Sequence, residues 1–349
     1  MKTRSEMCAP LIAGECTIRH ARPDEGPAIV DFIREYWSPN HIFVTHPEIH
    51  DYQHLVDGEM TYIVAECNQT GKLLCIQGYV VTNQTDTPDI WGTIWKVGNT
   101  QIPALGLRVH EYIKKAFPQR TYAAVGVNKT TFPIHKRLRH TIGYQKHYYR
   151  LAERETYRIA AIQQRTNTPI GPSPFSLKRL ATWHDFIHAF SPEAYKDRKP
   201  YKDQWFLKRR YFEHPVYTYQ VFGIDKDETR VDSVLIAREL QQNDARILRI
   251  VDYIGLDDDL TGISAAVDEL IQQGEYEYID FYCAGIPDAC LTQAGFKLKD
   301  ANDPNIIPNY FEPFEQKNVD LTYVTSDPES FYAFKADSDQ DRPNVLPTQ

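Results

Sequence analysis

The sequence lacks the patterns that mark membrane and secreted proteins. No apolar run approaches the roughly 18 residues of a membrane-spanning helix, and no apolar segment follows the basic residues near the start. The six cysteines form no CxxC pair, which disfavours zinc and redox motifs and favours free thiols in a reducing compartment. We therefore expect a cytoplasmic protein without a secretory signal or a membrane span.

Basic residues are too few for a nucleic-acid-binding face. The chain has 39 Lys and Arg against 47 Asp and Glu, a net charge of −8. It also lacks Gly-x-Gly-x-x-Gly and Gly-Lys-Ser/Thr, the phosphate-binding loops of dinucleotide and nucleotide-hydrolysing enzymes. Four histidines cluster in the first half, but Pro47 and the missing Glu after His50 disfavour a zinc site (His41, His46, His50, His54). We expect neither a nucleic-acid partner nor a metal.

What the sequence does contain is a repeat. Its 349 residues suffice for about two domains, and one order of predicted elements occurs twice, over 16–151 and again over 179–296. Each copy reads strand, helices, hairpin, strand, helix, strand, short helix and strand. The stretch at 166–174 is rich in Asn, Thr, Pro and Gly and is the expected linker. The predicted domains are therefore 1–165 and 175–349.

Two short motifs stand in the first copy. A turn after the strand at 91–97 leads into a predicted helix, with the sequence Asn99-Thr100-Gln101-Ile102-Pro103-Ala104-Leu105-Gly106-Leu107. Further on, Asn128 follows a strand, and a short helix leads to Gly143-Tyr144. The repeated order and these motifs resemble the Gcn5-related N-acetyltransferase (GNAT) superfamily, here in tandem.

This resemblance implies an α/β (α+β) fold of two GNAT-like domains, each a mixed, mostly antiparallel sheet flanked by helices. In that family the fourth strand separates from the fifth, and acyl-coenzyme A enters the gap. Backbone amides of the next turn and the following helix N-terminus hold the pyrophosphate, since unpaired amides and the positive helix end attract anions.

The first copy is the better match to this donor site. The resemblance implies that acyl-coenzyme A contacts Asn99, Thr100, Gln101, Leu105, Gly106, Leu107 and Asn128, although one glycine of the family turn is missing. In the second copy Gly255 and Leu256 precede three aspartates at 257–259, which would repel a pyrophosphate. Two alternatives stay open: the turn is an ordinary strand-to-helix connection, and Asn128 is a helix cap.

The C-terminal stretches 303–314 and 334–344 look like those of tandem-domain amino-sugar N-acyltransferases from bacterial surface-polysaccharide pathways, of the N-hydroxybutyryltransferase type. This resemblance implies transfer from acyl-coenzyme A to the amine of a dTDP-linked amino-dideoxy sugar. The residues suited to sugar and diphosphate are polar, aromatic or basic (Asn305, Asn309, Tyr310, Glu312, Lys335, Arg342). A packed loop and a solvated tail are the alternatives, and the oligomeric state stays open.

Three residues are candidates for catalysis. Asp252 interrupts an apolar strand, where a carboxylate needs a partner or a raised pKa, so it is either a base or the partner of a nearby Arg. His135 follows Asn128 on the short helix and is either a base or a hydrogen-bonding residue. Tyr310 could protonate the leaving thiolate. A sugar amine with a pKa near neutrality needs little help, so water alone could also serve.

Two rival functions fit the same pattern. One is a non-catalytic carbohydrate-binding module built from two decayed copies of the fold. The other is a transferase that uses aminoacyl-tRNA as donor, which the net charge of −8 disfavours.

Overall fold

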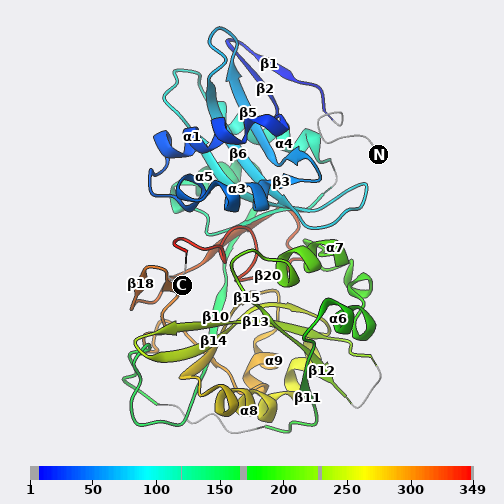
Figure 1. Ribbon diagram of the computed structural model, residues 1–349, viewed down its shortest axis with the longest axis vertical. Coiled ribbons are helices and arrows are strands. Elements are labelled where there is room, and N and C mark those ends of the chain that lie inside the picture. The colour runs from blue at the N-terminus through cyan, green and yellow to red at the C-terminus, as the bar shows by residue number, and fades with distance from the viewer. Residues whose placement is uncertain (1–7, 119, 166–170, 227–229, 347–349) are drawn as a thin grey trace.

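The computed structural model describes residues 8–118, 120–165, 171–226 and 230–346. Its strands form two large mixed sheets that follow one another along the long axis of the molecule (Figure 1). The first sheet has the order β1-β2-β5-β6-β7-β8-β19-β9, and the second has the order β11-β12-β13-β14-β15-β10-β16. The predicted fold class, two mixed and mostly antiparallel sheets flanked by helices, is confirmed. Within these described ranges, no helix is both long and apolar enough to cross a membrane.

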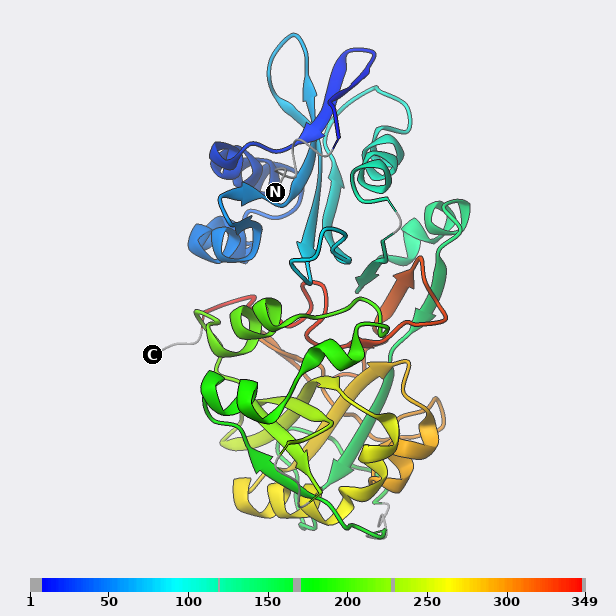
Figure 2. The same cartoon turned by 90° about the vertical axis from the view of Figure 1, so that its right-hand side faces the viewer.

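Most of the first sheet comes from the first part of the chain. Its strands are β1 (Leu11–Ala13), β2 (Cys16–His20), β5 (Tyr62–Cys67), β6 (Leu73–Val81), β7 (Ile90–Val97), β8 (Tyr122–Val125), β9 (Thr141–Tyr144) and β19 (Thr322–Thr325). The helices are η2 (Pro23–Glu25), α1 (Gly26–Tyr36), α2 (Ile42–Thr45), α3 (Pro47–His54), α4 (Leu105–Ala116), η3 (Lys129–Thr131) and α5 (Phe132–Arg137), and β3 (Leu55–Val56) pairs with β4 (Glu59–Met60). Helices α1 to α3 cover one face of the sheet and α4 the other (Figure 2).

The helices of the first sheet follow its apolar spacing. In α1, Ile29, Phe32 and Ile33 repeat at helical intervals and are buried, and Pro27 lies in the first turn, where its missing N–H costs nothing. In α4, Leu105, Val109, Tyr112 and Ile113 keep the same spacing and pack into the core on the other face. Each face of the sheet therefore has its own apolar core.

The second sheet repeats the arrangement. Its strands are β11 (Ser176–Arg179), β12 (Gln220–Asp225), β13 (Val234–Gln242), β14 (Ala245–Ile254), β15 (Tyr278–Ala284), β10 (Lys146–Leu151), β16 (Lys297–Leu298) and β20 (Ala333–Phe334), which pairs with β15. The helices are α6 (Trp183–Ala189), η4 (Pro192–Tyr195), α7 (Gln204–Leu207), the π-helical turn η5 (Lys208–Phe212), η6 (Asp257–Gly262), α8 (Ser264–Gly274) and α9 (Asp288–Gln293). A small hairpin joins β17 (Tyr310–Phe311) to β18 (Phe314–Glu315).

The two sheets exchange strands. We expected the strand at 145–151 to complete the first copy, but β10 pairs with β15 of the second sheet, with His147 opposite Tyr282. In return β19, from the end of the chain, lies between β8 and β9 of the first sheet. The sheets therefore do not divide the chain at the expected linker. The prediction for 145–151 failed because the alternation of side chains along a strand does not say which sheet the strand joins.

Each sheet contains a fork where two parallel strands separate. In the first fork, β7 and β8 pair only at Ile90–Tyr122 and Trp91–Ala123, although β7 continues to Val97. In the second fork, β14 and β15 pair at 248–250 with 279–281, and β14 continues to Ile254. Both β7 and β14 carry one extra residue against the preceding strand near their fork, and such a bulge bends a strand.

Candidate active site

The first fork is lined by polar aromatic side chains on the α4 face. Trp95 of β7 lies 5.2 Å from the ring of His110 on α4, and His110 lies 4.7 Å from the ring of Tyr122 on β8. His135 and His140 join them from α5 and the residues after it, with their Nδ1 atoms 3.2 Å apart. Strands and helices far apart in the sequence thus bring three histidines to one fork.

Several polar atoms at this fork are buried without a hydrogen-bond partner in the part of the chain described. They are Trp95 Nε1, His110 Nε2 and His140 Nε2. Burial lowers the pKa of His135 to about 4 and, with His135 nearby, that of His140 to about 3. The histidines are therefore neutral at physiological pH and can each offer one donor and one acceptor to a polar ligand.

The N-terminus of α4 lies at the open end of the first fork and has no side-chain cap within the described residues. Its first turn contains no acidic residue, and Ala104 precedes it in the left-handed conformation, at φ 55°. The first amides of any α-helix have no partner inside the helix, so this end can receive an anion.

The predicted donor-site residues divide between exposed and packed positions. Asn99 and Gln101 are exposed in the turn, and the Thr100 hydroxyl accepts a hydrogen bond from the Ile102 amide at 3.2 Å. Gly106 and Leu107 are half-buried on the first turn of α4, and Leu105 is buried in the core, so only its backbone could reach a ligand. Asn128 caps η3 by accepting hydrogen bonds from the amide and hydroxyl of Thr130, both at 2.9 Å, as its alternative interpretation proposed.

The second fork is occupied by the chain itself. Strand β20 pairs with β15, Cys283 opposite Phe334, and the amide of Ala336 donates to the Val251 carbonyl of β14 at 2.9 Å. The segment 333–336 is thus bonded to both arms of the fork. The N-terminus of α8, the helix that follows the second fork, is also capped, because Ser173 Oγ accepts a hydrogen bond from the Ala265 amide at 2.7 Å. The aspartates at 257–259 precede this helix, as the sequence predicted.

Asp252 lies in a buried charged cluster at the second fork. Lys202 Nζ lies 2.7 Å from both Asp252 carboxylate oxygens and 2.7 Å from Asp337 Oδ1. The Tyr211 hydroxyl also donates to Asp252. Burial and the nearby Asp252 raise the pKa of Asp337 to about 7, while the two carboxylates outweigh burial and raise the pKa of Lys202. The partner of Asp252 is therefore a lysine, where we had considered an arginine.

The C-terminal tail, residues 333–346, continues from the second fork to the first. Ser338 Oγ donates to the Gly92 carbonyl of β7 at 2.6 Å, and Gln340 Nε2 donates to the Val125 carbonyl of β8 at 3.3 Å. Gly126 makes room for this contact, because a Cβ there would lie 2.2 Å from Gln340 Nε2. Tail residues thus contact both arms of the first fork where those arms begin to separate.

A small cavity of about 50 Å³ lies beside this contact, between the two sheets. It is lined from α3 and the neighbouring strands (Tyr52, Gln53, Val56, Val80, Val81), from α7 and the segment after it (Trp205, Phe206, Arg209, Arg210, His214), and from the tail (Ser338, Asp339, Asp341, Arg342). Arg342, a predicted substrate residue, is among them. The cavity opens on the α3 face of the first sheet, the face opposite α4.

The other predicted substrate residues lie against the second sheet. Asn305 is fully used in packing, since its side chain bonds the Gln163 and Gln164 amides, the Gln164 carbonyl and the Tyr149 hydroxyl. Glu312 accepts a hydrogen bond from Tyr217 at 2.8 Å, and Tyr310 begins the β17–β18 hairpin.

Asn309 and Lys335 are buried near Arg249 of the same sheet. The Asn309 carbonyl accepts from Arg249 at 2.7 Å, and its side-chain amide has no partner among the described residues. Burial and Arg249 lower the pKa of Lys335 to about 7. The predicted residues therefore form separate groups, and of the predicted catalytic residues only His135 lies at the first fork.

Sequence reasoning missed Lys202, Ser338 and Gln340. Lys202 lies fifty positions from Asp252 in an exposed-looking Lys-Pro-Tyr-Lys stretch, and nothing local marks it as buried. Gly126, directly after a strand, is the one local signal that another segment approaches closely there.

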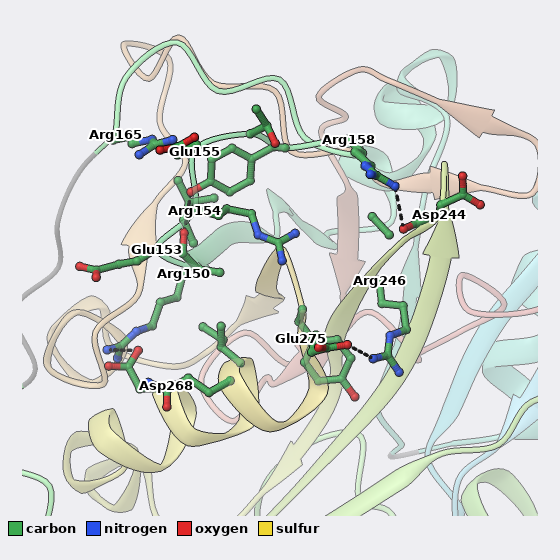
Figure 3. Close-up of a pocket in the computed structure, with 18 residues that line it drawn as sticks. Arg150, Glu153, Arg154, Glu155, Arg158, Arg165, Asp244, Arg246, Asp268 and Glu275 are labelled. Atoms are coloured by element: carbon green, nitrogen blue, oxygen red, sulfur yellow. Dashed lines mark hydrogen bonds and ion pairs between the residues drawn. The ribbon is translucent and has the colours of Figure 1, made fainter.

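A much larger cavity, about 1370 Å³, lies elsewhere, between β10, the β13–β14 turn and α8 (Figure 3). Two of its five arginines are held by carboxylates: Arg150 by Asp268 at 2.7 Å and Arg246 by Glu275 at 3.3 Å. Neither fork contributes to it, so we do not place the site there. Within the described ranges no group of three or more His, Cys, Asp or Glu is arranged to hold a metal.

No protein-family model and no curated protein matches the sequence. Solved structures match it over most of its length. A GCN5-related N-acetyltransferase from Anabaena variabilis is 12% identical. The alignment covers 89% of this chain and 72% of the Anabaena chain, with a TM-score of 0.51. An Enterococcus faecalis protein described as a "probable N-acyltransferase" is 9% identical. The alignment covers 91% of this chain and 74% of the Enterococcus chain, with a TM-score of 0.52. Saccharomyces cerevisiae N-myristoyltransferase with bound myristoyl-CoA is 9% identical. The alignment covers 93% of this chain and 86% of the yeast chain, with a TM-score of 0.46. At a TM-score above 0.5, the first two show that this chain has the GNAT fold.

Proposed function

We propose that the protein is an acyl-coenzyme-A-dependent N-acyltransferase with one donor site, at the first fork. The observation that carries this proposal is the difference between the forks. The first has separated strands, unpartnered buried polar atoms and an uncapped helix N-terminus. The second is filled by β20, has its helix N-terminus capped by Ser173 and carries three aspartates.

The groups at the first fork fit the parts of coenzyme A. Amides at the start of α4, around Gly106 and Leu107, would receive the pyrophosphate. Trp95, His110 and His140 offer buried donors and acceptors where the pantetheine arm, which carries two amides, would pass between β7 and β8. We propose that His135 contacts this arm or the leaving sulfur, because it lies 5.9 Å from the Trp95 ring.

The reaction is the transfer of an acyl group to an amine. An ammonium first loses a proton, the neutral nitrogen attacks the thioester carbonyl carbon, and the carbon–sulfur bond breaks as the amide forms. The products are the amide, the coenzyme A thiol and one released proton. Much of the rate would come from holding the two reactants at the fork in the correct orientation.

We propose a nucleotide-linked amino sugar as acceptor, entering from the cavity between the sheets. Support comes from the arginines Arg209 and Arg342 and the aromatic Trp205 on its walls, which suit a diphosphate and a sugar ring. The resemblance of the C-terminal stretches favours a dTDP-linked amino-dideoxy sugar, with 3-hydroxybutyryl as one candidate acyl group. At about 50 Å³ the cavity admits only a small group, so the two sheets or the tail must move to admit the whole acceptor.

Calorimetric titration tests the proposal. We expect coenzyme A to bind with a stoichiometry of one per chain, and dTDP-amino sugar to release further heat when coenzyme A is present. No heat with coenzyme A under either condition would overturn the transferase function. A stoichiometry of two would contradict the assignment of the donor to the first fork alone. Coenzyme A binding without any response to the sugar nucleotide would overturn only the choice of acceptor.

A further inference from the structure

The C-terminal tail places a carboxylate at the first fork. The residue between the two anchors Ser338 and Gln340 is Asp339, and its side chain is 14% exposed. It lines the small cavity together with α3 residues, so it lies on the face of the sheet opposite α4. If the donor occupies the α4 face, as proposed above, Asp339 approaches the same fork from the acceptor face.

Asp339 is also the tail carboxylate with spare hydrogen-bonding capacity. Its Oδ1 accepts one bond from Gln340 Nε2 at 3.3 Å, and its Oδ2 lies 3.5 Å from Arg342 Nε, a loose ion pair. Asp341 differs, because Arg238 at 2.7 Å and the Tyr219 hydroxyl at 2.9 Å already occupy its oxygens. Asp337 is held by Lys202 and by the Phe334 amide.

Around Tyr62 of the first sheet lie buried polar atoms that nothing in the described chain satisfies. Tyr62 OH, Thr93 Oγ1 and His50 Nε2 are among them. Burial and then the negative charge of Asp339 raise the pKa of Tyr62 well above its usual value. Thr93 and Ile94 lie opposite Gly78, where β7 has its extra residue, and a Cβ on Gly78 would meet both Thr93 Oγ1 and the Tyr62 ring.

We propose that Asp339 binds the cationic amine of the acceptor and positions it at the first fork. This inference rests on the proposed function and adds the residue that recognises the reacting group. An ammonium has three donors and a carboxylate has acceptor sites to spare, so their hydrogen bonds are charge-assisted and short. The acceptor class is thus a primary amine that enters from the cavity between the sheets, displacing the long Arg342 contact.

Two thioethers of coenzyme A test this without knowledge of the acceptor. S-aminoethyl-coenzyme A places an ammonium just beyond the sulfur, and S-propyl-coenzyme A has the same number of heavy atoms without the charge. We expect calorimetry to show the aminoethyl compound binding the wild type about tenfold more tightly. The ratio of the two affinities should fall to about one in Asp339→Asn, stay partly raised in Asp339→Glu, and be unchanged in the exposed control Asp320→Asn.

A second pair of variants covers the case in which Asp339→Asn does not fold. Gly126→Ala would push Gln340 away from β8, whereas Gly58→Ala introduces the same Cβ at another positive φ with no atom within 4 Å. The affinity ratio should fall in the first and not in the second.

The possible results separate the two proposals. An affinity ratio near one in the wild type, or a ratio unchanged in Asp339→Asn, would overturn the role of Asp339. Neither result would contradict the proposed donor site. Failure of both thioethers to bind the wild type would overturn the donor site itself, and the role of Asp339 with it.

Discussion

The two forks differ in how the chain occupies the space between two parallel strands that separate. In both forks two parallel strands separate, and a bulge bends the first of them, β7 in one fork and β14 in the other. In the second fork the free carbonyl of Val251 is satisfied by the backbone of Ala336, and Lys202 ties Asp252 to the inserted tail. In the first fork the tail, as far as the structure describes it, reaches the arms through the side chains of Ser338 and Gln340. Filling a fork with backbone makes it part of the core, and leaving it to side chains keeps it available to a ligand.

The largest effect should come from breaking the strand exchange on which both forks depend. Val324 lies on β19, is fully buried in the first core and belongs to the end of the chain. We expect Val324→Asp to lower the free energy of unfolding by at least about 3 kcal/mol, because a buried charge would have no partner. Urea denaturation followed by fluorescence measures it, with Asp320→Asn as the control. A loss below about 1 kcal/mol would mean that β19 is not needed by the first sheet.

The next effect concerns the closed fork. Asp252→Asn leaves Lys202 with only Asp337 as a buried counter-charge, so we expect a loss of about 2–3 kcal/mol in unfolding free energy. Asp24→Asn, at an 84% exposed side chain, should change stability little. If the second fork is purely structural, turnover per folded molecule should be unchanged. A loss of turnover without a loss of stability would instead restore the prediction that Asp252 is a catalytic base.

A further effect should appear in the pH dependence of the closed fork. The pKa of Asp337 is about 7 in the folded protein against an ordinary value of 3.8, because burial and Asp252 disfavour its ionised form. A raised folded-state pKa contributes stability that is complete below about pH 4 and is lost as pH rises to about 7. Asp337→Asn should remove this part of the pH dependence in thermal melts recorded between pH 4 and 8. An unchanged slope in the variant would contradict the assignment to Asp337.

The smallest effect should come from making the open fork resemble the closed one. Gln101→Asp adds a negative charge to the exposed turn before α4, as in the turn before α8. We expect the affinity for coenzyme A to fall about tenfold at low salt and less at high salt, because the charge repels the pyrophosphate and salt screens it. Gln69→Asp, in another exposed turn, is the control with the same charge change. Equal losses in both variants would mean that only net charge matters.

Local sequence patterns predicted most helices and strands but few of the long-range contacts between them. The spacing of Leu105, Val109 and Ile113 predicts α4, and the aspartates at 257–259 predict that the second copy disfavours an anion. That α4 is uncapped also follows from Ala104, which has no side-chain acceptor.

The rest depends on long-range contacts. A strand pattern gives the face of a residue but not the sheet that takes the strand, so β10 was assigned to the wrong sheet, and β19 was not predicted. Lys202 and Asp252 lie fifty positions apart in the sequence and meet only in the folded chain. The polar side chain of Asn305 suggested a ligand, but its hydrogen bonds to Gln163 and Gln164 serve the loop itself.

The strand exchange also determines when, during translation, the first sheet can be completed. Strand β8 ends at Val125 and β9 at Tyr144, but the strand that belongs between them leaves the ribosome about 180 residues later. At roughly 5–20 residues per second, the gap in the first sheet stays open for about 10–35 s. During that time β8 and β9 offer unpaired edges to any other nascent chain, a recognised route to aggregation. The first fork therefore gains its β19 neighbour and its tail contacts only when nearly the whole polypeptide has been made.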